Sequence, residues 1–176
     1  MRVDELVTRA RSQIGKGTVY RLGGGNLDPS APHPRDEQES ADCSAFACWA
    51  IGIRKYQPQF RWLVAFNGGW YNTGAVWRDA DLPIGLFEMA TQPYVGCLMV
   101  YPSVALARTH LRGVRRGPSV GHVGVVTEAR GGKATRVVHC SSGNFRRTGD
   151  AIRETDAAVF ERVAYSRYVW CATVER

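Results

Sequence analysis

The spacing of apolar and polar positions in the first half of the chain predicts two helices separated by a long loop. Residues 3–14 place apolar side chains at helical spacing, with acidic residues in the first turn and Gly15 as a stop. The stretch LGGGNLDPSAPHPRDEQES is rich in glycine and proline, so we expect a loop there. Residues 44–51 are apolar on nearly every face, which is typical of a buried helix, and Gly52 ends it.

The second half of the chain alternates apolar and polar positions, which is the pattern of strands. GCLMVYP predicts a short strand that ends at Pro102, and ERVAYSRYVWCATVE predicts a last strand. SVGHVGVVTEA and KATRVVHCSS flank Gly131-Gly132 and predict a hairpin. Helices followed by antiparallel strands indicate an α+β fold, and the length predicts one domain over residues 1–176.

Residues 54–95 are rich in aromatic side chains and have no clear period. Pro83 and Pro93 argue against long regular elements. A place in the core is the favoured interpretation of the aromatic side chains, and a groove that stacks on a ligand is the alternative. The residues concerned are Trp62, Phe66, Trp70, Tyr71 and Trp77.

The predicted hairpin determines which side chains share a face of the sheet. With Gly131-Gly132 at the turn, His122 lies opposite Ser141, and His139 lies opposite Gly124. Residues at even spacing along a strand share a face, so His122 and His139 are diagonal neighbours with backbones about 7–8 Å apart. A register slip of one residue would send the two rings to opposite faces.

The two histidines gain a chemical meaning from Cys43, which stands at the start of the second helix. A thiol at a helix N-terminus beside an imidazole is what nucleophilic catalysis requires, with the thiol pKa lowered by the helix dipole and by an imidazolium. His122 would be the base and His139 would orient it, while backbone N–H groups at the helix start would bind the oxyanion. The alternative is a buried structural thiol, which is the interpretation for Cys48, Cys97, Cys140 and Cys171.

A zinc site built from Cys43, His122, His139 and Cys140 is a second alternative. His139 and Cys140 are adjacent on a predicted strand, so their side chains point to opposite faces. The chain also lacks the paired-cysteine spacing of zinc sites. We therefore expect neither a metal nor an organic cofactor.

The formal net charge of +7 is compatible with an anionic partner. A polymer of the cell envelope is one candidate, and a merely solvated basic surface is the alternative. No recognition helix, zinc finger or stacking sheet points to nucleic acid, so none is expected, and no apolar run approaches the roughly 18 residues of a membrane span. The clustered arginines are Arg108, Arg112, Arg115, Arg116, Arg146 and Arg147.

Five segments of the chain carry a family resemblance. GTVYRLGGG is similar to a Tyr-x-aromatic-Gly-Gly motif, DCSAF to Asp-Cys-Ser-Gly, and GCLMVY to Gly-Asp-Leu-Val-Phe. GHVGVV is similar to His-Val-Gly-Ile, and VVHCSSG to a strand with Ile-His-Ala. In this order, over most of the chain, they resemble the NlpC-type cell-wall cysteine peptidases, a papain-like family related to the CHAP amidases.

The resemblance implies a papain-like fold, in which N-terminal helices, one of them a buried catalytic helix, pack on an antiparallel β-sheet. It implies that Cys43 is the nucleophile, His122 the base and His139 the orienting residue. Three positions depart from the family pattern, namely Leu22 for an aromatic residue, Ala45 for glycine and Cys97 for aspartate. The resemblance implies substrate-binding roles for Tyr20, Asp42 and Ser44.

The implied reaction is hydrolysis of the peptidoglycan stem peptide between D-glutamate and the diamino acid, through an acyl-enzyme. An amidase that cuts between the sugar and L-alanine, an acyl transferase, and a non-catalytic phage or envelope component remain alternatives. MRVDELVTRARSQIG lacks the apolar core of a secretory signal. We therefore expect synthesis in the cytoplasm and action at the cell wall after lysis, injection or delivery by a phage particle.

Overall fold

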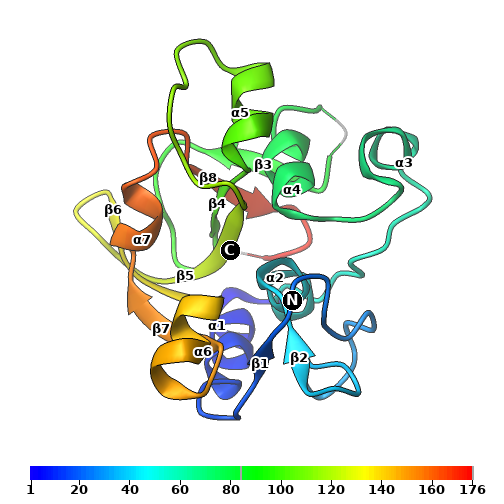
Figure 1. Ribbon diagram of the computed structural model, residues 1–176, viewed down its shortest axis with the longest axis vertical. Coiled ribbons are helices and arrows are strands. Elements are labelled where there is room, and N and C mark those ends of the chain that lie inside the picture. Colours follow the sequence, from blue (N-terminus) through cyan, green and yellow to red (C-terminus); the bar gives the residue numbers. More distant parts are fainter. Residues whose placement is uncertain (84, 176) are drawn as a thin grey trace.

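A six-stranded antiparallel sheet forms the centre of the structure (Figure 1), a computed structural model that describes residues 1–83 and 85–175. The strands are β1 (Val19–Tyr20), β2 (Ser40–Ala41), β3 (Phe87–Ala90), β4 (Leu98–Tyr101), β5 (His122–Arg130), β6 (Lys133–Cys140), β7 (Ile152–Asp156) and β8 (Arg167–Cys171). The order across the sheet is β3-β8-β4-β5-β6-β7, and β1 and β2 form a separate parallel pair.

Seven helices, counted over the described residues, accompany this sheet. They are α1 (Val3–Ser12), α2 (Cys43–Ala50), α3 (Arg61–Asn67), α4 (Thr73–Asp79), α5 (Val104–His110), α6 (Ser142–Thr148) and α7 (Ala158–Glu161). α2 packs against β5 and β6, and α1 packs against α2 and β5. The α+β class predicted from the sequence is confirmed. None of the helices in the described part of the chain has the length and apolarity that crossing a bilayer requires.

The N-terminal helices follow their sequence signals closely. α1 ends at Ser12, two residues before the predicted end, and Gly15 adopts a φ of 78° beyond it. Every residue of α2 is buried, as its all-apolar pattern predicts. The Asp42 side chain caps α2 by accepting a hydrogen bond from the backbone N–H of Ala45.

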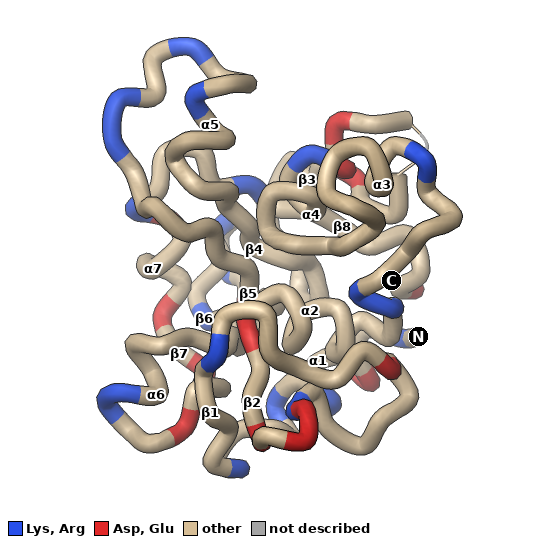
Figure 2. Tube along the Cα trace, turned by 45° about the vertical axis from the view of Figure 1, so that its right-hand side comes forward, with Lys and Arg blue, Asp and Glu red and all other residues tan. Residues whose placement is uncertain are grey.

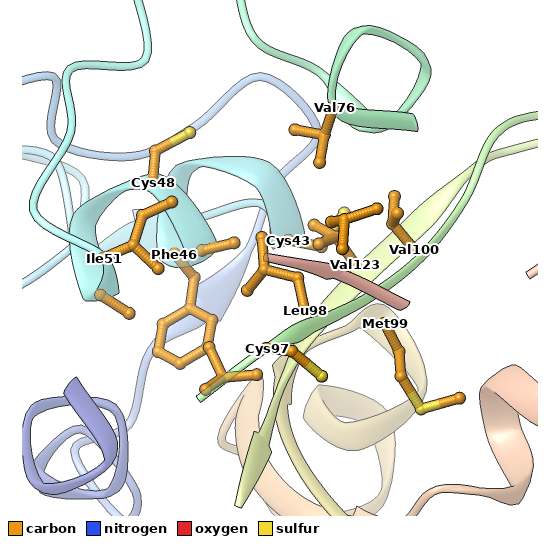
Figure 3. Close-up of a cluster of buried hydrophobic side chains, with 14 of the residues drawn as sticks. Cys43, Phe46, Cys48, Ile51, Val76, Cys97, Leu98, Met99, Val100 and Val123 are labelled. Atoms are coloured by element: carbon orange, nitrogen blue, oxygen red, sulfur yellow. The ribbon is translucent and has the colours of Figure 1, made fainter. Parts of the chain in front are cut away.

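One side of the buried helix α2 packs against the centre of the sheet. Figure 3 shows Phe46 of α2 in the same cluster of buried side chains as Leu98 of β4 and Val123 of β5. Gly25, at a φ of 124°, lets the preceding loop approach this helix, because a Cβ there would lie 2.3 Å from the Ala45 Cβ. The start of α2 is therefore enclosed by the sheet on one side and by a glycine-rich loop on the other.

The predicted hairpin register is confirmed where it matters for the histidines. Val125 pairs with Val138 and Val126 with Val137, which is the register centred on the Gly131-Gly132 turn. An irregularity lies farther along, between Val126 and Glu128. Both turn glycines have positive φ, 57° and 74°, as a tight hairpin turn of this kind requires.

The aromatic segment is more regular than its sequence predicts, since residues 54–95 contain α3, α4 and β3. Tyr71 and Trp77 are fully buried, so the core interpretation is correct for them. Trp70 is 38% exposed and packs against Tyr56, with ring centroids 4.7 Å apart and the rings tilted by 39°. The segment therefore supplies both core and surface aromatic side chains.

Two further predictions about the second half need correction. The last predicted strand, over ERVAYSRYVWCATVE, is shorter than expected because α7 ends at Glu161 and β8 begins only at Arg167. The second hairpin strand ends at Cys140, because Ser141 accepts a hydrogen bond from the backbone N–H of Asn144 and so caps α6. These short helices, α6 and α7, lie beside the strands that carry the two histidines (Figure 1).

Candidate active site

His122 and His139 meet on one face of the β5–β6 hairpin, as the register predicts. His122 is the first residue of β5, and its Nε2 lies 2.7 Å from Nδ1 of His139 on β6, within hydrogen-bond distance. A Cβ at Gly124 would lie 2.9 Å from the His139 Cβ, so glycine makes room for the second ring. The structure confirms this juxtaposition, while the roles of base and orienting residue stay predictions.

Two residues that the sequence does not single out complete the surroundings of the imidazole pair. Phe160 of α7 stacks on His122, with ring centroids 5.1 Å apart and an interplanar angle of 12°. Thr155 of β7 places its Oγ1 2.9 Å from Nε2 of His139. The ring of His122 is therefore oriented by a hydrogen bond at one nitrogen and by an aromatic face.

Burial keeps both imidazoles neutral near neutral pH. It lowers the pKa of His122 well below its usual value, and the neighbouring His139 lowers it further. Burial also lowers the pKa of His139 to about 4, with a smaller effect from the Arg147 guanidinium. In this state one ring donates its N–H and the other accepts, which leaves His122 able to accept a proton.

The lowered histidine pKa values predict that stability falls with acidity. Below pH 6.5 the unfolded chain binds protons that the folded chain does not, so the free energy of unfolding falls as pH drops from about 7 to about 4. For His139 the loss reaches about 2 kcal/mol at pH 5. Denaturant titrations of wild type, His139→Asn and the exposed-residue control His110→Asn, repeated across this range, check the prediction. In His139→Asn the free energy of unfolding should depend less steeply on pH than in wild type. An equally steep decrease in that variant would contradict the prediction.

Cys43 lies at the N-terminus of α2, against the strand that begins with His122. The backbone N–H groups of Val123 and Ser44 are placed to stabilise an anionic sulfur. The thiol is nevertheless 3% exposed, and burial, aided by the Asp42 carboxylate, raises its pKa to about 12. The sequence-based prediction of a lowered pKa is therefore wrong for this state, because desolvation outweighs the helix terminus.

The Cys43 thiol lies at the backbone of Val123, the residue after His122, and is not hydrogen-bonded to the His122 ring. No hydrogen bond joins Cys43 to His122 within residues 1–83 and 85–175. Cys43 also does not line the cavity beside the histidines. The two histidines are thus in direct contact, and Cys43 lies against β5, the strand of His122, with its thiol buried.

Asp42 and Ser44 belong to a buried network rather than to the cavity wall. The Ser44 hydroxyl donates to Asp42 Oδ1 at 2.8 Å, and the backbone N–H of Gly23 donates to Asp42 Oδ2 at 2.9 Å. Lys55, which sequence reasoning missed, places its Nζ 3.0 and 2.9 Å from the two carboxylate oxygens. Asp42 thereby holds the start of α2 in place, and the substrate-binding roles of Asp42 and Ser44 stay predictions.

A cavity of about 710 Å³ opens beside the two imidazoles. Tyr20, the remaining predicted substrate-binding residue, lines it together with Tyr101, and burial and the nearby Cys43 raise the pKa of the Tyr20 phenol. A second part of the lining comes from α6, the end of β7 and the segment around α7. It includes Ser141, Ser142, Gly143, Arg146, Arg147, Thr155, Asp156, Ala158, Val159 and Arg162.

Cys48, Cys97, Cys140 and Cys171 do not line the cavity, although Cys140 lies near enough to Cys43 and Tyr20 to interact with them electrostatically. All five thiols are free and buried, and Cys140 Sγ donates to the Ala41 carbonyl at 3.3 Å, on the face opposite His139. No group of three or more His, Cys, Asp or Glu side chains in the described part of the chain is arranged to hold a metal ion. The zinc alternative therefore gains no support from the geometry.

The two arginine clusters occupy different places. Arg146 and Arg147 lie on α6 at the cavity, whereas Arg108 and Arg112 belong to α5 and the loop after it. Figure 2 shows the two basic regions at separate parts of the molecule. An anionic envelope polymer as partner of this surface stays a prediction.

Comparisons with known proteins add a distant likeness. No protein-family model and no curated protein matches the chain. Among solved structures, the crystal structure of Ly7917 with the hydrolyzing product of MDP is similar, at 14% sequence identity and a TM-score of 0.49. The match covers 98% of this chain and 63% of Ly7917, so the chain spans less than two thirds of that protein's length. A likeness at this level identifies neither a family nor an activity.

Proposed function

We propose that the chain is a cysteine peptidase that cleaves the stem peptide of peptidoglycan between D-glutamate and the diamino acid. The observation that carries the proposal is the 2.7 Å contact between His122 and His139. Cys43, at the start of α2, lies at the backbone N–H of Val123, the residue that follows His122. A thiol, a base and a residue that orients the base are the parts of a nucleophilic triad. The proposal includes a papain-like arrangement of the α2 helix and the sheet.

The resting charges define the first step. With a neutral thiol and a neutral imidazole, Cys43 attacks the peptide carbonyl carbon as its proton passes to His122. Backbone N–H groups at the start of α2 bind the oxyanion that forms. The imidazolium then protonates the departing amine nitrogen, and the carbon–nitrogen bond breaks to leave a thioester.

The second step reverses the proton path. His122 takes a proton from water as the water oxygen attacks the thioester carbonyl. Collapse of the intermediate breaks the carbon–sulfur bond, releases the carboxylic acid and returns the proton to the Cys43 sulfur. His139, held by Thr155 at 2.9 Å, keeps the His122 ring oriented through both steps.

The substrate class rests on the five sequence segments that resemble the NlpC-type peptidases. A cavity of about 710 Å³, with Tyr20 on its wall, has room for a short branched peptide. How the enzyme reaches the wall, by lysis, injection or a phage particle, stays a prediction. The peptide bond that the enzyme cleaves is to be identified from the masses of the digestion products.

The test is digestion of a defined muropeptide by the purified protein, with EDTA present to suppress metal-dependent peptidases. Mass spectrometry of the products should show fragments that separate between D-glutamate and the diamino acid. Fragments separated between the sugar and L-alanine would instead identify an amidase. Transfer of the acyl group to an added amine in place of water would identify a transferase.

One observation favours a second candidate function. Cys43 is buried and lies outside the cavity lining, as a structural thiol would. In that case the chain is a non-catalytic component of a phage particle or cell envelope that keeps the fold of a peptidase. Digestion that yields no product from any defined muropeptide would favour this candidate over the peptidase.

A further inference from the structure

The part of the cavity lining that comes from α6 and the segment around α7 is cationic. Arg146 and Arg147 belong to α6, and Arg162 is the residue that follows α7. All three line the cavity. Asp156 is the one acidic side chain among the lining residues. Three arginines and one aspartate therefore line the space next to His122 and His139.

The charges on this wall are not neutralised by the protein. Within residues 1–83 and 85–175, none of the three arginines forms an ion pair. Arg147 donates to the Asn144 side chain at 3.0 Å, and Asp156 Oδ1 accepts the backbone N–H of Ala158 at 2.7 Å. The guanidinium donors of Arg146 and Arg162 are thus available to a ligand.

The same cavity also has an apolar side. Val120 is 51% exposed and Val159 is 39% exposed, and both line the space. Gly143 also lines the space, and a Cβ there would meet no atom nearer than Ser141 Oγ at 3.9 Å, so a ligand can approach this backbone closely. A ligand that suits these walls is a peptide with aliphatic stretches and free anionic groups, rather than a neutral or cationic chain.

We infer that Arg146 and Arg162 are specificity-determining residues that bind free carboxylates of the substrate. This inference rests on the proposed function and refines it, because stem peptides carry a free α-carboxylate at D-glutamate and, where the diamino acid is diaminopimelate, a second free carboxylate there, and some are amidated at these groups. Guanidinium groups pair with carboxylates through two parallel hydrogen bonds, which a carboxamide does not reproduce. The enzyme should therefore discriminate against amidated stem peptides.

Arg147 is left unchanged in the test, because its guanidinium lies close enough to His139 to lower the pKa of that imidazole.

The test measures binding rather than cleavage. The probes are a fluorescently labelled tripeptide, L-Ala–γ-D-Glu–diaminopimelate, and the same peptide amidated at its free α-carboxyl groups. Fluorescence anisotropy gives Kd for the full chain with Cys43→Ala, which leaves the probe intact. We expect the free acid to bind about fivefold more tightly than the amide, with a smaller difference at high salt. Adding Arg146→Gln and Arg162→Gln should remove the difference.

The control is Arg61→Gln in the same Cys43→Ala background, since Arg61 begins α3 on the far side of the molecule from α6 and α7 (Figure 1). This variant should keep the preference for the free acid. Equal affinity for the two peptides, no measurable binding of either, or a preference that survives the double arginine substitution would overturn the inference. Failure of the peptidase proposal appears separately, as intact muropeptide after incubation with wild type.

Discussion

Replacement of Cys43 by alanine should lower kcat/KM for the muropeptide by at least about a thousandfold, whereas replacement of Cys48 by alanine should change it by less than about threefold. The two thiols are a matched pair on α2. They are 3% and 2% exposed, and burial raises the pKa of each to about 12. They differ in position, because only Cys43 lies at the helix start beside Val123 and the histidine strand.

The comparison separates catalysis from folding. Each substitution removes a similar buried sulfur, so each should lower the free energy of unfolding by about 1 kcal/mol. Steady-state kinetics on the muropeptide and denaturant titrations of both variants provide the two readouts. Full activity in Cys43→Ala, or an equal loss of activity in Cys48→Ala, would contradict the assignment of the nucleophile.

The matched pKa values also explain why thiol acidity does not identify the nucleophile here. Burial disfavours the thiolate at both positions, and the proposed base, His122, precedes the residue whose backbone N–H lies at Cys43. In the proposed mechanism His122, which is neutral and hydrogen-bonded to His139, accepts the Cys43 proton as the substrate carbonyl arrives. A difference in activity between Cys43→Ala and Cys48→Ala would therefore reflect where each thiol lies on α2, and not a difference in the pKa of the two thiols.

The histidine pair could be predicted from the sequence because its determinants are local. Gly131-Gly132 sets the turn, strict alternation sets the faces, and Gly124 leaves space for the His139 ring. The buried helix after Cys43 was equally readable, since a segment without a polar face must be enclosed. These features need only the period of a strand or helix and the geometry of one turn.

The rest of the candidate site depends on packing that no local pattern records. Phe160 and Arg162 reach the histidines and the cavity through α7, a helix of four residues, which is too short to leave a periodic signal. The sign of the Cys43 pKa shift was missed for the same reason, because the depth of burial is a tertiary property. Lys55 follows α2 in a loop, and its attachment to Asp42 becomes visible only in the folded chain.

Replacement of Lys55 by methionine is the substitution for which we expect the largest loss of stability, about 3 kcal/mol in the free energy of unfolding. The side chains of Lys55 and Asp42 are 9% and 6% exposed, so the methionine variant leaves a buried carboxylate without its cation. Asp42 keeps hydrogen bonds from Gly23, Ser44 and Ala45, which holds the loss near the lower end of the range for buried pairs. Denaturant titration measures it.

The control is Arg2→Met, which breaks the Arg2–Asp4 pair at the surface and should leave the free energy of unfolding nearly unchanged. The double variant Asp42→Asn/Lys55→Met removes both charges, and it should recover at least about 1 kcal/mol relative to Lys55→Met, because an amide is less costly to bury than an unpaired carboxylate. A double variant less stable than Lys55→Met would show that the carboxylate stabilises the fold through its backbone hydrogen bonds more than through the ion pair. Asp42 would then serve mainly as the helix cap that places Cys43, and Lys55 would be secondary to it.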